Sequence, residues 1–195
     1  MNRITFCLLL SLIVGTFSAL SADDAPKNED GKTTEVKLKD LTLKIPATWK
    51  LKPSTSSMRL ATYTIPATEG DTESGELTVF NFAGGGGDVG ANISRWVDQF
   101  TGEQRTSKVT KGKAGDNDYY FANIAGTYLK PIGPPIQRKT ESAPGYRMTG
   151  VILVLQGKGV YYLKLAGPDA TIKAQADAFR KSFGGNSEDE TDYEI

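Results

Sequence analysis

Histidine is absent from this 195-residue chain, and its single cysteine, Cys7, lies close to the start. The lack of imidazole excludes serine–histidine and cysteine–histidine catalysis within the chain, together with histidine metal sites. An excess of one charge is also lacking, because 23 basic residues balance 23 acidic ones. The composition therefore predicts no electrostatic footprint for nucleic acid or for an anionic membrane.

The first 22 residues have the pattern of an export signal. Arg3 supplies a positive start, residues 4–14 are almost continuously apolar, and residues 18–22 provide small side chains for cleavage. We expect cleavage after Ser21 or Ala22, which would remove Cys7 and place the protein in the periplasm or outside the cell. A retained short anchor is the alternative, although the apolar run is shorter than the ~20 residues that span a bilayer as a helix.

Composition divides the remainder of the chain into three parts. Residues 23–34 are polar and predict a flexible linker, and residues 184–195 are rich in acids and predict a disordered tail. Residues 35–183 then form a single domain, which at this length can bury a core without disulfides. Loss of Arg3 with the leader leaves 22 basic residues against 23 acidic ones. We also expect no stable insertion into a membrane once the leader has been cleaved.

Alternating apolar and polar residues predict an α+β domain in which an antiparallel sheet is flanked by helices. Residues 36–45 favour either a tight hairpin or one bent strand, and residues 77–82 a central strand covered on both faces. Residues 105–113 predict an edge strand, residues 156–159 a hairpin turn, and residues 131–145, with four prolines, a stiff loop. Apolar stripes predict two helices, one capped by Asp88 and ended by Gly102, the other running from Asp169 to Gly184.

The order of several motifs resembles the PsbP-like superfamily, the α/β/α sandwich that is shared with the Mog-type nuclear import factor. An amphipathic strand ends in a proline and a tryptophan at residues 41–49, and the mid-chain helix carries Ile-Ser-Arg-Trp-Val at residues 93–97. A long strand at residues 150–155, a second at residues 159–165 and a closing helix that ends at Phe183 complete the pattern. The resemblance implies a largely non-enzymatic fold, like that of exported bacterial members, with no catalytic residue and no cofactor.

The segment from residue 131 to residue 147 is the leading candidate for a binding surface, because long loops in compact domains are often functional. It combines Arg138, Lys139 and Arg147 with Tyr146, a mixture suited to a protein or glycan surface. The alternative is a decorated hairpin tip with no special role.

A glycine-rich loop precedes the first predicted helix and is the second candidate, a mobile lip beside a pocket. Its residues are Gly84, Gly85, Gly86, Gly87 and Asp88. The alternative is a flexible connection to a capped helix. Asp71, Glu73 and Glu76 form a weak candidate for a Ca²⁺ site, although their spacing does not match an EF-hand and a solvated acidic loop explains it as well.

Three functions follow as hypotheses. The first is an exported, non-catalytic binding or accessory domain that engages a protein or cell-envelope partner through residues 131–147 and the adjoining sheet face. The second is a carrier of a small molecule or cation that uses residues 84–90. The third, a hydrolase based on a carboxylate pair, is the least supported, since the charged residues lie mostly in loops and on polar strand faces.

Overall fold

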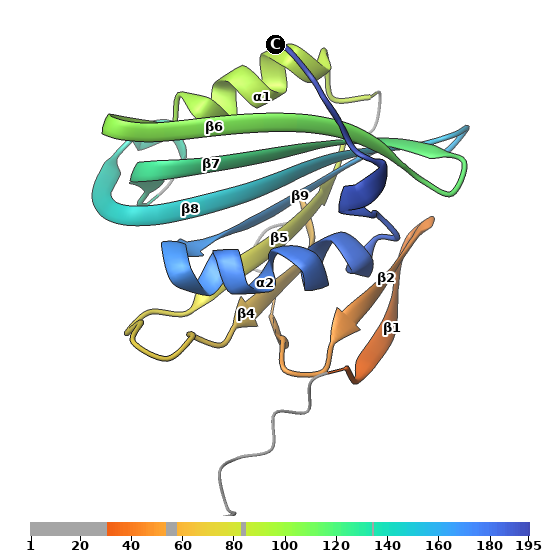
Figure 1. The fold of residues 1–195 in the computed structure, drawn as a ribbon, viewed down its shortest axis with the longest axis horizontal. Helices are drawn as coiled ribbons and strands as arrows, with labels where there is room; N and C mark the ends of the chain where they lie inside the picture. Colours follow the sequence, from red (N-terminus) through yellow and green to blue (C-terminus); the bar gives the residue numbers. More distant parts are fainter. Residues whose placement is uncertain (1–30, 54–57, 83–84, 134) are drawn as a thin grey trace, which may run out of the picture.

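A computed structural model describes residues 31–53, 58–82, 85–133 and 135–195, so the predicted export signal and most of the predicted linker lie outside it. Its centre is an antiparallel sheet of eight strands in the order β10-β6-β7-β8-β9-β5-β4-β3 (Figure 1). A separate hairpin, β1–β2, and two helices complete the domain, which confirms the predicted α+β class. The elements are β1 Thr33–Leu38, β2 Leu41–Pro46, β3 Lys50–Lys52, β4 Arg59–Ile65, β5 Gly75–Asn81, α1 Val89–Val97, β6 Phe100–Ala114, β7 Asn117–Pro131, η1 Pro135–Gln137, β8 Thr140–Leu155, β9 Gly159–Pro168, α2 Asp169–Ser182, η2 Ser187–Asp189 and β10 Thr191–Asp192.

The face of the sheet that carries α2 holds the larger core. Ile172 and Phe179 of α2 are fully buried against the sheet, and Leu43 of β2 joins the same cluster. Residues 36–45 form a hairpin and not one bent strand, with Lys39 in the left-handed region at its turn. Because β1 begins at Thr33, the last two residues of the predicted linker belong to this hairpin.

The opposite face of the sheet carries α1. Asp88 caps this helix as predicted, since its Oδ1 accepts a hydrogen bond of 2.8 Å from the Ala91 N–H. Trp96 packs against β8 at Gly150, where a Cβ would lie 2.5 Å from the indole ring. The predicted end at Gly102 is wrong: the helix ends at Val97, because Phe100 is already a fully buried residue of β6.

Two segments that were predicted to be irregular are partly held by strand pairing. The long hairpin between β7 and β8 has Pro131 with Thr140 as its last pair, so the predicted stiff loop is wrong for residues 140–145, whereas the connection between the two strands carries the short helix η1. The predicted disordered tail is also wrong, because Thr191 and Asp192 pair with β6 and the Glu190 side chain is only 5 % exposed. Four prolines indicated a loop in the first segment and acid content a solvated tail in the second, whereas strand pairing orders part of the first, and strand pairing and one buried ion pair hold the second.

Residues 77–82 were predicted to be a central strand, and β5 lies inside the sheet between β4 and β9. Leu77 and Val79 point into the α2 core and are fully buried. Thr78 and Phe80 point to the opposite face, where Phe80 packs against the core cluster that contains Trp96 of α1. Neither helix in the described part of the chain has the length and apolar character needed to cross a bilayer.

Candidate functional site

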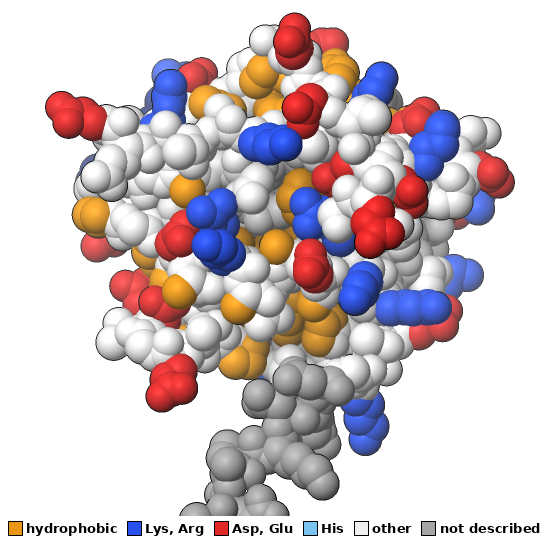
Figure 2. Space-filling view, viewed as in Figure 1, with side chains coloured by type: hydrophobic (Ala, Val, Ile, Leu, Met, Phe, Trp, Pro, Cys, Tyr) orange, Lys and Arg blue, Asp and Glu red, His pale blue; other side chains and the backbone are white. Residues whose placement is uncertain are grey.

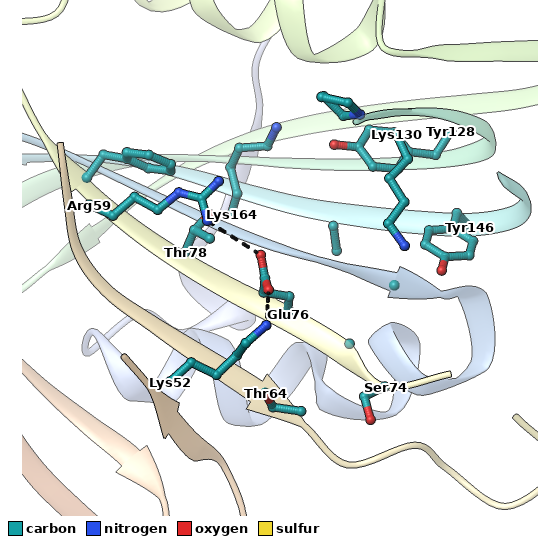
Figure 3. A pocket seen from close by; sticks show the side chains of 15 residues that line it. Lys52, Arg59, Thr64, Ser74, Glu76, Thr78, Tyr128, Lys130, Tyr146 and Lys164 are labelled. Atoms are coloured by element: carbon teal, nitrogen blue, oxygen red, sulfur yellow. Dashed lines mark hydrogen bonds and ion pairs between the residues drawn. The ribbon is translucent and has the colours of Figure 1, made fainter. Parts of the chain in front are cut away.

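A hollow of about 420 Å³ lies on the α1 face of the sheet, over β4, β5 and β9 and beside the β7–β8 hairpin (Figure 3). Thr78 on β5 and its cross-strand partner Lys164 on β9 lie in its floor. Volumes of this size are typical of sites for small ligands. The pocket is lined by Lys52, Arg59, Thr64, Ser74, Gly75, Glu76, Thr78, Phe80, Tyr128, Lys130, Pro131, Tyr146, Lys164, Ala166 and Gly167.

Cations dominate the charge of this lining. Lys52, Arg59, Lys130 and Lys164 face a single lining carboxylate, Glu76. Glu76 is shared, since its carboxylate lies 3.0 Å from the Lys52 Nζ and 3.9 Å from the Arg59 guanidinium. Figure 3 shows Lys52 and Arg59 reaching Glu76 from neighbouring strands. A second carboxylate, Glu73, lies 3.9 Å from the Lys130 ammonium, so cations outnumber the two carboxylates at the pocket by four to two.

Two tyrosines form the wall nearest the hairpin. The Tyr128 and Tyr146 rings stack with their centroids 6.2 Å apart, and the Lys130 ammonium lies 5.9 Å from the Tyr146 ring centroid. The Tyr146 hydroxyl donates a hydrogen bond to the Glu73 carboxylate. Burial raises the pKa of the Tyr146 phenol to about 12, and Glu73 adds to the shift. The wall is therefore aromatic and keeps its phenol neutral at physiological pH.

Lys164 is the cation with the least compensation. Its Nζ donates a 2.9 Å hydrogen bond to the neutral side chain of Gln99. None of the ion pairs found in the described residues includes it. Burial lowers the pKa of the Lys164 ammonium to about 8, and the Arg59 guanidinium adds to the shift. The charge of Lys164 is thus costly at this position, and a bound anion would reduce that cost.

The four residues predicted in the 131–147 segment do not form one surface. Arg138 and Lys139 are exposed at the hairpin tip, whereas Tyr146 is buried in the pocket wall. Arg147 points to the α2 face, where it bonds the Asp169 carboxylate at 2.8 Å and the Asn123 side chain at 2.6 Å. Of the predicted set, only Tyr146 lines the pocket, and Arg147 fastens β8 to the start of α2 instead.

The glycine-rich loop is not a lip of this pocket. None of its described residues, Gly85 to Asp88, contributes to the lining, and Gly84 lies outside the described residues. The Gly85 carbonyl accepts from the Tyr162 hydroxyl at 3.5 Å, and the Gly86 carbonyl accepts from the Asn92 side chain at 2.9 Å. These bonds tie the loop to β9 and α1.

The three acids considered for Ca²⁺ are engaged separately. Asp71 accepts hydrogen bonds from the N–H and the hydroxyl of Thr171 on α2. Glu73 accepts from Tyr146, and Glu76 pairs with the pocket cations. In the part of the chain that the structure describes, no group of three or more acids and cysteines is placed to hold a metal ion. The acids therefore stabilise neighbouring elements and do not converge.

Lys52, Arg59, Lys130 and Lys164 were not among the predicted site residues. Only Lys164 could have been singled out as a site residue from the sequence. It lies between Leu163 and Leu165 in a strongly apolar strand, and lysine is rare at buried positions. The convergence of the four depends on the pairing of strands that are distant in sequence.

Charge is mixed on the face of the molecule shown in Figure 2, where basic and acidic side chains alternate without a large patch of one sign. The excess of cations in the pocket differs from the mixed charge of that face. No family model matches this chain, and no curated protein matches it significantly.

Proposed function

We propose that the protein is a non-catalytic binding domain whose site is the basic pocket, and that its ligand carries an anionic group. The observation that carries this proposal is the gathering of four cations in the lining, of which Lys52 and Arg59 share Glu76, Lys130 lies 3.9 Å from Glu73, and Lys164 has no ion pair among the described residues. Ammonium and guanidinium groups bind carboxylates and phosphates through short, charge-assisted hydrogen bonds. Partial enclosure strengthens such bonds relative to those at an open surface.

The aromatic wall supports a ligand with a planar or apolar part next to its anionic group. Tyr128 and Tyr146 offer stacked rings, and Phe80 adds an apolar side chain on the floor. Small-molecule sites commonly combine apolar area with a few placed polar groups. Binding, and not turnover, is the simpler expectation for a chain with no imidazole.

The anionic group can belong to a free molecule or be displayed by an acidic protein or cell-envelope component. A larger partner is favoured by the adjoining hairpin, since Lys130 and Pro131 line the pocket and lead directly to its tip. Arg138 and Lys139 at the tip are exposed, as is Ile136, at 90 %. This arrangement would continue the contact beyond the pocket. It agrees with the hypotheses of an exported accessory domain and of a PsbP-like sandwich, in which each face of the sheet carries a helix.

Thermal unfolding in the presence of a panel of anions tests this function. Phosphate, citrate, an aromatic carboxylate and a short polyglutamate peptide are compared in low salt with matched sodium concentrations. A ligand present at a hundred times its Kd stabilises the folded state by about 2.7 kcal/mol, which for a domain of this size raises Tm by roughly 5–10 °C. A response to the peptide alone would identify a macromolecular partner, and a response to small anions a free ligand.

The double variant Arg59→Gln/Lys130→Gln should lose this stabilisation. Its matched control is Lys158→Gln/Lys173→Gln, which removes the same charge from exposed positions outside the pocket. Equal stabilisation of both variants by every anion would show that the pocket is not the site. No saturable response of the wild-type protein to any anion would refute the proposed function.

A further inference from the structure

Lys164 is placed as a reactive amine as well as an anion contact. Its side chain rises from the floor of the pocket, on the face of the sheet opposite its buried neighbours Leu163 and Leu165, and points away from Glu76 (Figure 3). Glu76 already pairs with Lys52 and Arg59, and among the described residues the Lys164 Nζ has one hydrogen bond, to Gln99. An amine in a half-enclosed site beside another cation has the environment that makes a lysine nucleophilic.

The surroundings of Lys164 favour its neutral form. The charged and titratable side chains that line the pocket with it are Lys52, Arg59, Glu76, Tyr128, Lys130 and Tyr146. Burial is the larger cause and the Arg59 guanidinium the smaller one, and together they lower the pKa of Lys164 to about 8. Roughly a tenth of the amine is therefore neutral at pH 7. For an ordinary lysine with a pKa near 10.4 that fraction is several hundred times smaller.

We propose that Lys164 captures the carbonyl carbon of an anionic aldehyde or ketone as an imine. The inference rests on the proposed function, because the pocket cations would hold the anionic group of the same molecule. Arg59 and Lys130 lie on different strands around Lys164, and the rings of Tyr128 and Tyr146 accommodate a planar carbonyl compound. The ligand class is thus a small, planar carbonyl compound that carries a carboxylate or a phosphate.

The reaction balances without any further reactant. The nitrogen lone pair of the neutral amine attacks the carbonyl carbon, and the C=O π pair moves to oxygen. One proton passes from the nitrogen to this oxygen to give a neutral carbinolamine. Loss of the hydroxyl group with a proton from nitrogen releases one water and leaves the C=N bond. Nothing is oxidised or reduced, and hydrolysis restores Lys164 and the carbonyl compound. Lys164 is therefore a site of reversible, stoichiometric capture.

Reductive trapping tests the proposal. The full chain is incubated with pyridoxal 5′-phosphate, an aromatic aldehyde that bears a phosphate, and borohydride then converts any imine into a stable secondary amine. Peptide mass spectrometry measures the labelling rate of each lysine. We expect Lys164 to be labelled about tenfold faster than the exposed Lys173 at pH 7, because the pocket cations hold the phosphate of the probe beside Lys164 and burial lowers the pKa of its amine. Benzaldehyde, which lacks the anionic group, should show a weaker preference for Lys164.

The pH profile and two variants complete the test. Labelling of Lys164 should reach half its maximum near pH 8. Lys164→Arg keeps a cation but cannot form an imine, so it should lose the fast adduct. Lys173→Met should leave the fast adduct unchanged.

Labelling spread over exposed lysines, with Lys164 no faster than Lys173, would overturn the inference. If anions still raise the Tm of the wild-type protein in that case, only the imine proposal fails. If neither the adduct nor the anion response is found, the proposed function fails as well.

Discussion

Single residues in this domain are distinguished by whether their polar atoms find partners. Thr149 on β8 is fully buried, and its hydroxyl is the one buried side-chain polar atom in the described residues that lacks a hydrogen-bond partner. Thr110 on β6, also buried, donates a 2.5 Å hydrogen bond to the Glu190 carboxylate. A buried hydroxyl without a partner carries a desolvation cost, whereas a bonded one contributes to stability.

The two threonines should therefore respond in opposite ways to the same substitution. We expect Thr149→Val to raise the free energy of unfolding by about 1 kcal/mol, because it removes an unsatisfied polar group at almost constant volume. Thr110→Val should lower it by about 1–2 kcal/mol, since it leaves Glu190 with one donor fewer. Urea unfolding at pH 7 measures both, and a destabilised Thr149→Val protein would contradict the expectation.

At the scale of elements, α2 depends on a residue from another part of the chain for its first turn. Pro168 precedes the helix and makes no side-chain capping bond. Asp71, in the connection between β4 and β5, accepts hydrogen bonds of 2.9 and 2.5 Å from the Thr171 N–H and hydroxyl. A carboxylate at this position also complements the positive end of the helix dipole. The loop between β4 and β5 is thereby fastened to α2.

Removal of this capping bond should weaken the domain. We expect Asp71→Ala to lower the free energy of unfolding by about 1 kcal/mol, the usual cost of a lost N-terminal cap. Asp71→Asn keeps an oxygen acceptor and should recover more than half of the loss. Circular dichroism during urea unfolding measures both variants. Asp71→Ala with wild-type stability would mean that the capping bonds contribute nothing.

At the scale of the whole molecule, the chain end is locked onto the sheet by one buried ion pair. The Glu190 carboxylate accepts from the Arg180 Nε at 2.6 Å and from the Tyr119 hydroxyl at 3.0 Å. The Arg180 guanidinium lies 3.8 Å from the Phe121 ring centroid, and its side chain is 15 % exposed. Beyond the pair, Tyr193 packs edge-on against Tyr120. The last residues therefore belong to the folded domain and close one edge of the sheet.

Loss of one partner of this pair should be costly. We expect Glu190→Ala to lower the free energy of unfolding by about 3 kcal/mol, because it leaves the Arg180 charge in a largely dry site. Asp192→Ala is the matched control: its partner is Lys108, both side chains are more than two-thirds exposed, and the loss should stay within about 0.5 kcal/mol. Guanidinium unfolding compares the two variants, and equal effects would refute a specific role for the buried pair.

Much of the local structure could be predicted from sequence alone. Alternation in β5, β8 and β9 indicated strands, and Asp88 before an apolar stripe indicated the start of α1, because both patterns depend on neighbours within a few residues. The same reasoning failed at residues 140–145, since prolines and glycines mark a hairpin tip as readily as a loop. It also failed in the acidic tail, where Glu190 is held by a partner from another element.

Composition and short-range periodicity were enough to predict the α+β character of the domain and to exclude imidazole chemistry, because neither inference depends on contacts between distant residues. The site, in contrast, follows from tertiary structure. Lys52, Arg59, Lys130 and Lys164 lie on four different strands, and they meet because β5 pairs with both β4 and β9 while the β7–β8 hairpin curves beside them. Alternation along a strand shows which residues share a face. Which strands lie next to one another is a non-local choice, made by the packing of the whole sheet.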